Sequence, residues 1–301
     1  MPNFAPSVHY DKILSEVSIR YSQDGYIATR VFPALPVVKE SDLIDVYDRE
    51  NVRIFNDLRA DGATAHEIDW GWTLRPYFAQ EHALRHLVTD RALKNVDEPI
   101  DLFVDTTEHL TDMLMLAADA LAASIMLDPN NNVGATNANW TNYSTASPKT
   151  DIMTAKNAIF TASGRQPNVM IVPSTVANRM TLIQEIKEER KYVNDLTQSG
   201  LPRNLWGLEV VEVALIRNTA QPGQSPSFQE LWSDNIWIGY VDPNPRRKML
   251  TYGLAPTPRP RTVRTYRDEA RAGTWVEVSW IYDFTVVARE CGYILQSVFT
   301  A

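Results

Sequence analysis

The sequence contains little cysteine and no excess of positive charge. Its single cysteine, Cys291, has no second cysteine with which to form an internal disulfide. Because Cys291 lies in an apolar, strand-like stretch, we interpret it as a buried hydrophobic residue rather than a nucleophile. The 29 Lys and Arg residues are outnumbered by 37 Asp and Glu residues, which gives a net charge of −8. This negative charge disfavours tight binding of nucleic-acid phosphates as the main function of the protein.

The sequence also lacks the common motifs of enzymes. Its twelve glycines form no dinucleotide-binding or phosphate-loop motif, and neither a nucleophile elbow nor a Cys-x-x-Cys pair occurs. His82 and His86 are spaced to share one face of a helix and bind a divalent metal, but they lack the zinc-protease glutamate and a third ligand. Paired carboxylates such as Asp101 with Asp105 are typical of a solvated helix face. We therefore predict no catalytic residue, cofactor or metal, and keep a metal-dependent enzyme as a remote alternative.

Signals for export and for a membrane anchor are missing as well. Residues 1–6 provide neither a basic segment nor an apolar one, and the helix predicted over 97–127 carries seven acidic side chains, five of them from Asp101 to Asp119. We expect a soluble protein that stays in the compartment where it is made. A chain of 301 residues, 44% of them hydrophobic, is long enough for two packed domains or for one body with long extensions.

The first quarter of the chain predicts an arm followed by a hairpin. Residues 1–36 end in Val31-Phe-Pro-Ala-Leu-Pro36, whose prolines favour an extended path at the edge of a sheet. Residues 37–78 predict a long two-stranded hairpin with a polar tip at 55–66, because Ile68, Trp70, Trp72 and Leu74 alternate with polar residues. Isolated hairpins are only marginally stable in water, so this one needs a surface to cover it, and a neighbouring subunit would provide one.

The middle of the chain predicts a long helix and then an α/β unit. Residues 97–127 show helical spacing of apolar side chains, with Pro99 in the first turn, and would form a strut of about 45 Å. Residues 149–163 predict a helix, 169–172 a buried strand and 174–190 a second helix. Two long strands, within 261–267 and 274–299, would return to the body.

An arginine-rich run follows the α/β unit. It contains Arg259, Arg261, Arg264 and Arg267, with Tyr266 among them and no lysine. Arginine side chains suit pairing with carboxylates or phosphates. In an acidic chain we favour salt bridges between subunits, then a plain exposed strand face, then contact with packaged nucleic acid.

The order of these parts resembles the major capsid proteins of tailed bacteriophages, which have the HK97-like fold. The likeness covers nearly the whole chain, and the order of its segments carries more weight than any one of them. Those segments are Val31-Phe-Pro-Ala-Leu-Pro-Val37, Gln80-Glu-His-Ala-Leu84, Asp97-Glu-Pro-Ile-Asp-Leu102, Gly164-Arg-Gln-Pro-Asn168, Leu205-Trp-Gly-Leu-Glu-Val-Val211 and Ile238-Gly-Tyr-Val-Asp-Pro243.

The resemblance implies an α+β fold and a structural role. Hexamers and pentamers would close an icosahedral shell around double-stranded DNA, as part of a virion assembled in the cytoplasm of a bacterial host. An encapsulin-type nanocompartment is the alternative. The implied parts are an N-terminal arm (1–36), an extended loop (37–78), a peripheral domain (79–148) with a spine helix (97–127), an axial domain (149–258) and return strands of the peripheral domain (259–301).

Two departures from relatives refine the expected partners. The hairpin begins near residue 37, which leaves no room for the long N-terminal scaffolding region of some relatives, so we expect a separate scaffolding protein, besides a portal and a possible decoration protein. Other relatives join their subunits by an isopeptide bond between a lysine in the extended loop and an asparagine late in the peripheral domain. This chain has Lys39 at the base of the loop, but no asparagine follows Asn244, so we predict no such linkage. The predicted interface residues are Leu58, Arg59, Trp70, Trp72, Arg259, Arg261, Arg264 and Arg267.

Overall fold

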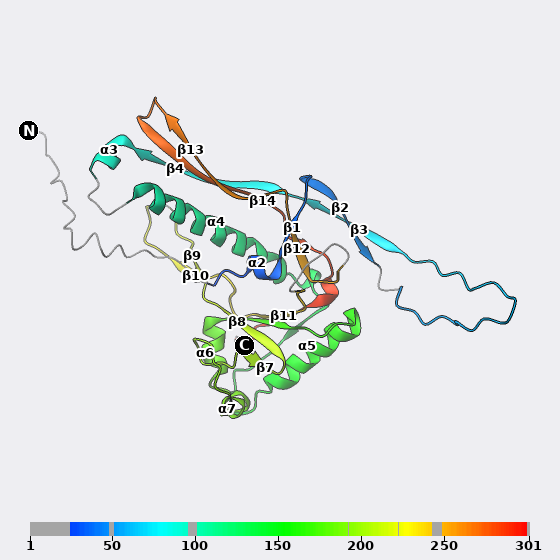
Figure 1. Cartoon of the computed structure of the whole chain (residues 1–301). Coiled ribbons are helices and arrows are strands. Elements are labelled where there is room, and N and C mark those ends of the chain that lie inside the picture. Colours follow the sequence, from blue (N-terminus) through cyan, green and yellow to red (C-terminus); the bar gives the residue numbers. More distant parts are fainter. Residues whose placement is uncertain are drawn as a thin grey trace, which may run out of the picture.

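The computed structural model describes residues 25–47, 51–95, 101–191, 193–221, 223–242 and 249–299. Most of the predicted arm, the predicted first turn of the long helix and the predicted turn after Asp242 lie outside these residues. The described chain forms two layers with a hairpin that extends from one side (Figure 1). Figure 1 shows the long helix α4 beneath a three-stranded sheet, and a second sheet with its own helices below α4.

The upper layer consists of α4 (Leu102–Met126) and the antiparallel sheet of β4 (Gln80–Thr89), β14 (Gly273–Tyr282) and β13 (Arg259–Asp268). The long helix predicted over 97–127 is confirmed, but it begins at Leu102. Asp101 is its N-cap: its carboxylate accepts hydrogen bonds from the backbone N–H groups of Phe103 and Val104. Twenty-five residues give the helix a length of about 37 Å.

Helix α4 is long and apolar enough, by length and composition, to cross a membrane. In this fold its apolar face has a partner, because Leu110, Leu114 and Met126 are buried in a core shared with β4 and β14. From the sheet, Val276 and Val278 belong to the same core. The apolar side chains of this helix face therefore pack against other parts of the same chain.

The lower layer is a mixed six-stranded sheet in the order β5-β16-β11-β6-β8-β7. The predicted helix, buried strand and second helix are confirmed, although the second helix is divided at residues 181–183. The first helix ends as predicted at Gly164, whose φ of 70° favours glycine. The elements are β5 (Gly134–Asn137), α5 (Pro148–Ser163), β6 (Val169–Pro173), α6 (Ser174–Met180), α7 (Gln184–Arg190), β7 (Asn204–Leu205), β8 (Leu208–Val213), β11 (Ile236–Gly239) and β16 (Gly292–Gln296).

Sheet membership departs from the ranges implied by the resemblance. Strand β5 was expected with residues 79–148 and β16 with the return strands at 259–301, but the two pair in parallel in the lower sheet. Strand β12 (Gly253–Thr257), expected with residues 149–258, pairs instead with β1 and β15. The reason is that a hydrophobic pattern identifies strands but does not identify their partners, and these pairings join distant parts of the chain.

The hairpin consists of β2 (Ser41–Tyr47) and β3 (Trp72–Phe78), paired antiparallel. The predicted hairpin is thus present, but its return strand begins at Trp72 rather than near Ile68. Gly71 directly precedes the strand, and glycine is disfavoured within strands, which agrees with a return strand that begins at Trp72. Tyr77 anchors the hairpin to the body by packing in a small core with Leu35 and Val287.

Short elements complete the fold. The extended path predicted for Val31–Pro36 is confirmed only for Ala34–Pro36, the edge strand β1, which pairs in parallel with β12. Val31 instead ends the short helix α2. The remaining elements are α2 (Ala28–Val31), β1 (Ala34–Pro36), α3 (Asp90–Lys94), η2 (Pro129–Asn131), β9 (Ile216–Asn218), β10 (Phe228–Glu230), β15 (Thr285–Val286) and η3 (Arg289–Cys291).

Candidate functional site

The two faces of the hairpin differ in what they contact. Ile44, Val46 and Tyr77 share the face that packs on the body. The opposite face is apolar and points away from the body, since side chains alternate along a strand. Four large side chains make up this outer hairpin face, each 46% to 63% exposed: Leu43, Trp72, Leu74 and Phe78.

Beyond the strands, residues 51–71 form a long exposed loop. Its base is closed by hydrogen bonds between the Asn51 side chain and Gly71: Nδ2 donates to the Gly71 carbonyl at 2.7 Å, and Oδ1 accepts from the Gly71 N–H at 3.0 Å. Near the tip, the Arg59 side chain donates to the carbonyl of Ala63. The exposed apolar side chains of the loop are Val52, Ile54, Phe55, Leu58, Ile68 and Trp70.

The structure places the predicted hairpin residues on one extension. Leu58 is 87% exposed, and Trp70 and Trp72 are more than half exposed. Only Trp72 belongs to a strand, however, and Arg59 is partly engaged with its own loop. An extension that exposes this much apolar surface needs a covering partner, because a monomer rarely leaves a large contiguous apolar patch in water.

The predicted arginines lie on the second exposed element, strand β13. Arg267 binds Asp90 of helix α3 through two hydrogen bonds, Nη1–Oδ1 at 2.5 Å and Nη2–Oδ2 at 2.7 Å. This guanidinium holds the pKa of Asp90 below its ordinary value, mainly by hydrogen bonding. Arg259 pairs with Glu81 on β4. Some of the carboxylates that we expected from neighbouring subunits are therefore supplied by the same chain.

Arg264 has an intrachain partner as well. Its Nε and Nη2 atoms lie 2.8 and 2.6 Å from Oε1 of Glu277, a residue that is only 7% exposed. Tyr266 donates its hydroxyl to the same carboxylate at 3.2 Å, and Arg85 donates to the Tyr266 oxygen at 3.0 Å. Of the four predicted arginines on β13, Arg261 alone forms no ion pair within the described residues. It is the arginine of this run most available to another molecule.

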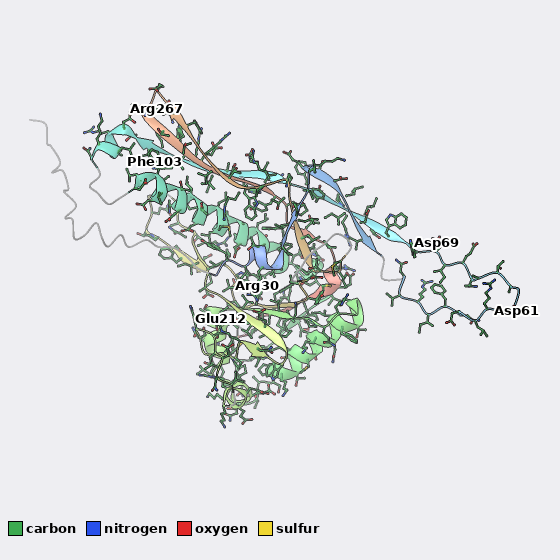
Figure 2. All side chains as sticks on the ribbon, viewed as in Figure 1. Arg30, Asp61, Asp69, Phe103, Glu212 and Arg267 are labelled. Atoms are coloured by element: carbon green, nitrogen blue, oxygen red, sulfur yellow. The ribbon has the colours of Figure 1, made fainter. Side chains whose placement is uncertain are left out.

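The two surfaces are not brought together within one chain. Figure 2 shows Asp61 and Asp69 on the loop at one end of the molecule and Arg267 at the other. The predicted interface residues therefore divide into two separate surfaces.

The proposed helical arrangement of His82 and His86 is wrong. Both lie on strand β4, where four residues span about 13 Å, too far apart for one metal ion. His82 instead stacks on the ring of Tyr282 at 4.5 Å, and burial lowers its pKa. No group of three or more potential metal ligands occurs among the described residues. The stretch gave no signal for a strand, because its apolar residues Ala83, Leu84, Leu87 and Val88 recur at helical rather than alternating positions.

Cys291 is fully buried, as predicted, in the short helix η3 before β16. Burial raises the pKa of its thiol to about 12, so the thiol form persists at neutral pH.

Sequence reasoning missed two buried carboxylates that organise the fold, Glu277 and Asp119. Asp119 is completely buried in α4 and contacts residues near the start of the described chain. A signal was available: Asp119 is the single charged residue in the stretch from Met113 to Leu127. A lone acid within an apolar helix is either buried with a partner or lines a site.

Comparison with known proteins identifies the class to which this fold belongs. A phage-related protein of Bordetella bronchiseptica RB50 superposes with a TM-score of 0.71 at 24% identity, over 96% of this chain and 97% of that one. The capsid structure of cyanophage P-SCSP1u gives a TM-score of 0.65 at 11% identity, over 98% of both chains. The fold is that of the HK97-like phage capsid proteins.

The sequence comparison defines the family. Residues 74–295 match the phage capsid protein family, so the chain belongs to that family. The major capsid protein of Burkholderia phage BcepMu is 23% identical over 240 residues, which cover 77% of this chain and 76% of the relative. The expected resemblance to tailed-phage major capsid proteins is confirmed. Because the family is structural, the enzyme alternative falls, and the encapsulin alternative is not favoured.

Proposed function

We propose that this protein forms the hexamers and pentamers of an icosahedral head shell that encloses double-stranded DNA. The observation that carries the proposal is the outer hairpin face, whose apolar side chains point away from their own body. In this proposal the hairpin and the 51–71 loop lie on a neighbouring subunit. Helix α4 serves as the spine of a peripheral domain, and the six-stranded sheet forms the axial domain around the symmetry axes.

Assembly would gain its energy from many modest contacts. Covering a large apolar side chain contributes roughly 2 kcal/mol, so the four residues of the outer hairpin face give each subunit a useful but small driving force. Repetition of the same contact over a closed shell converts this into a stable particle. On strand β13, Arg261 is available for ion pairs between subunits, and Arg259, Arg264 and Arg267 would keep their intrachain partners while contacting a neighbour at the rim.

The proposed partners follow from this role. A separate scaffolding protein would set the curvature of the shell, a portal would occupy one vertex, and a decoration protein would bind the outer surface. DNA would be enclosed without sequence-specific contacts, and the net charge of −8 disfavours tight binding of its phosphates. Assembly would take place in the cytoplasm of the bacterial host.

The test is to change the outer hairpin face and observe assembly. Trp72→Ser removes an exposed aromatic side chain without disturbing the monomer core, and Trp72→Phe is the matched control that keeps the face apolar. We expect the serine variant to remain folded by circular dichroism but to yield few closed particles by electron microscopy, while the phenylalanine variant assembles normally. Normal shells from the serine variant would contradict the role of this face.

A further inference from the structure

Asp119 joins the start of the described chain to the long helix. Its Oδ2 accepts a hydrogen bond from the backbone N–H of Ile27 at 2.8 Å, and its Oδ1 accepts one from the N–H of Ala28 at 2.9 Å. The carboxylate is completely buried. It therefore provides acceptors for two N–H groups at the first turn of α2, which lack partners within the helix.

The segment around these hydrogen bonds is fixed by packing as well. Ile27, Ala28, Val31 and Phe32 are at most 1% exposed and belong to the same core as α4. Figure 1 shows α2 lying beside α4 at the junction of the two layers. Releasing this segment would expose those side chains and the Asp119 carboxylate together.

Among the described residues, no basic side chain pairs with the charge on Asp119. Its pKa depends on burial and on the two backbone hydrogen bonds. The titratable group that faces it from the sheet is Tyr282 on β14, whose pKa is raised by burial and then by the charge of Asp119. His82 stacks on Tyr282, and Arg30 of α2 pairs instead with Glu209 on β8.

Two effects on Asp119 compete, and burial wins. Removing an ionised carboxylate from water without a counter-charge favours the protonated form, whereas the two N–H donors favour the ionised form. Burial raises the pKa of Asp119 from 3.8 to about 6, because the hydrogen bonds offset only part of the desolvation. Once the segment is released, the exposed carboxylate would return to its ordinary pKa.

We propose that Asp119 and residues 27–32 form a proton-sensitive latch, which holds the N-terminal segment on helix α4 more firmly as the pH falls. The sign follows from linkage: the docked state has the higher pKa, so it binds the proton more tightly, and protonation favours docking. The effect is present below about pH 6 and saturates near pH 3.8. Raising the pH to neutrality loosens the latch.

The latch controls the point at which the preceding chain enters the body. Docking fixes residues 27–32 against α4, whereas release would make the same residues available to a neighbouring molecule. The latch is a property of the single chain and does not depend on shell formation. Its failure in a test would therefore leave the proposed function untouched.

Hydrogen exchange with mass spectrometry on the full, unassembled chain tests the latch. The readout is the protection factor of peptides covering residues 25–33, corrected for the intrinsic pH dependence of exchange. In the wild type we expect about tenfold higher protection at pH 5 than at pH 7.5, as a shift of the pKa from 3.8 to about 6 requires. Equal protection at the two pH values would overturn the proposal.

Two variants separate the latch from general effects of pH. Asp119→Asn cannot ionise, so its protection should be independent of pH, although lower overall because its amide nitrogen cannot accept the second N–H. Asp105→Asn, on the exposed part of the same helix, is the charge-matched control and should keep the tenfold change. A pH response that persists in Asp119→Asn would refute the assignment to Asp119.

Discussion

Glu277 is almost fully buried on the outer side of the upper sheet, although its carboxylate prefers water. Arg264 and Tyr266 supply the hydrogen bonds that make this burial tolerable. The sequence suggested that Arg264 acts between subunits, but it could not reveal that β14 brings Glu277 directly opposite on the paired strand. A residue predicted to serve assembly therefore also serves the stability of the single chain.

Because Arg264 has a partner within the chain and Arg261 does not, substitutions of the two arginines should differ in their effect on the free energy of unfolding. Arg264→Glu should lower the free energy of unfolding by about 1–3 kcal/mol, because Glu277 loses its partner and gains a like charge. Arg261→Glu should change that free energy by less than about 0.5 kcal/mol, since Arg261 has no ion pair within the described residues. Urea unfolding of both variants provides the measurement.

The same pair of variants isolates the surface role of β13. If Arg261→Glu folds normally yet assembles poorly, the defect belongs to the contact between subunits. The double variant Arg264→Glu/Glu277→Arg should recover part of the lost stability. No recovery, or equal unfolding of Arg261→Glu and Arg264→Glu, would mean that the intrachain pair contributes nothing.

At the scale of elements, helix α4 depends on small residues as much as on large ones. Ala118, Ala122 and Ala123 are buried where the helix contacts its neighbours. Alanine permits close approach there, and it also has the highest intrinsic helix propensity. This part of the helix has no room for a longer side chain.

Enlarging one of these alanines should destabilise the fold. Ala122→Leu should cost about 1–3 kcal/mol of unfolding free energy, because the added carbons force the helix away from its packing partners. Ala117→Leu, on the exposed side of the same helix, is the matched control and should stay within about 0.5 kcal/mol of the wild type. Thermal and urea unfolding measure both, and similar losses at the two positions would argue against close packing at Ala122.

The elements also show which parts of the fold can be predicted from sequence patterns. The long helix, α5 and the buried strand β6 were predictable because each carries a local period or a run of apolar side chains between clear boundary residues. The pairing of β16 with β5 was not predictable, since it depends on contacts between distant segments. For the candidate site, the placement of Trp72 on an apolar strand face followed from alternation, whereas the burial of Asp119 and Glu277 required the tertiary structure.

At the scale of the whole molecule, the outward hairpin and the arginine strand lie at opposite ends and give one chain two surfaces for the proposed contacts with copies of itself. The lysine and asparagine expected for an isopeptide link between those copies are not both present. Lys39, at the base of the hairpin, lies 3.5 Å from Asp42 in an exposed ion pair, and no asparagine follows Asn244 to react with a lysine.

We therefore predict that mature particles contain no covalent links between subunits. Particles boiled in detergent should run on a denaturing gel as a single band at the mass of one chain, 34.1 kDa. Lys39→Arg keeps the charge and removes the amine nucleophile, so it should leave both particles and gel pattern unchanged. A ladder of higher bands that disappears in Lys39→Arg would contradict this prediction.

The order of strands in the lower sheet has a consequence for protein synthesis. Strand β16 lies between β5 and β11, yet the ribosome makes it after every other strand of that sheet. Until it emerges, β5 has no neighbour and β11 has an open edge, so the earlier segments cannot complete their core. A chain whose synthesis stops before β16 would thus fail to reach the folded shape that assembly requires. Only chains translated through β16 would then be incorporated into particles.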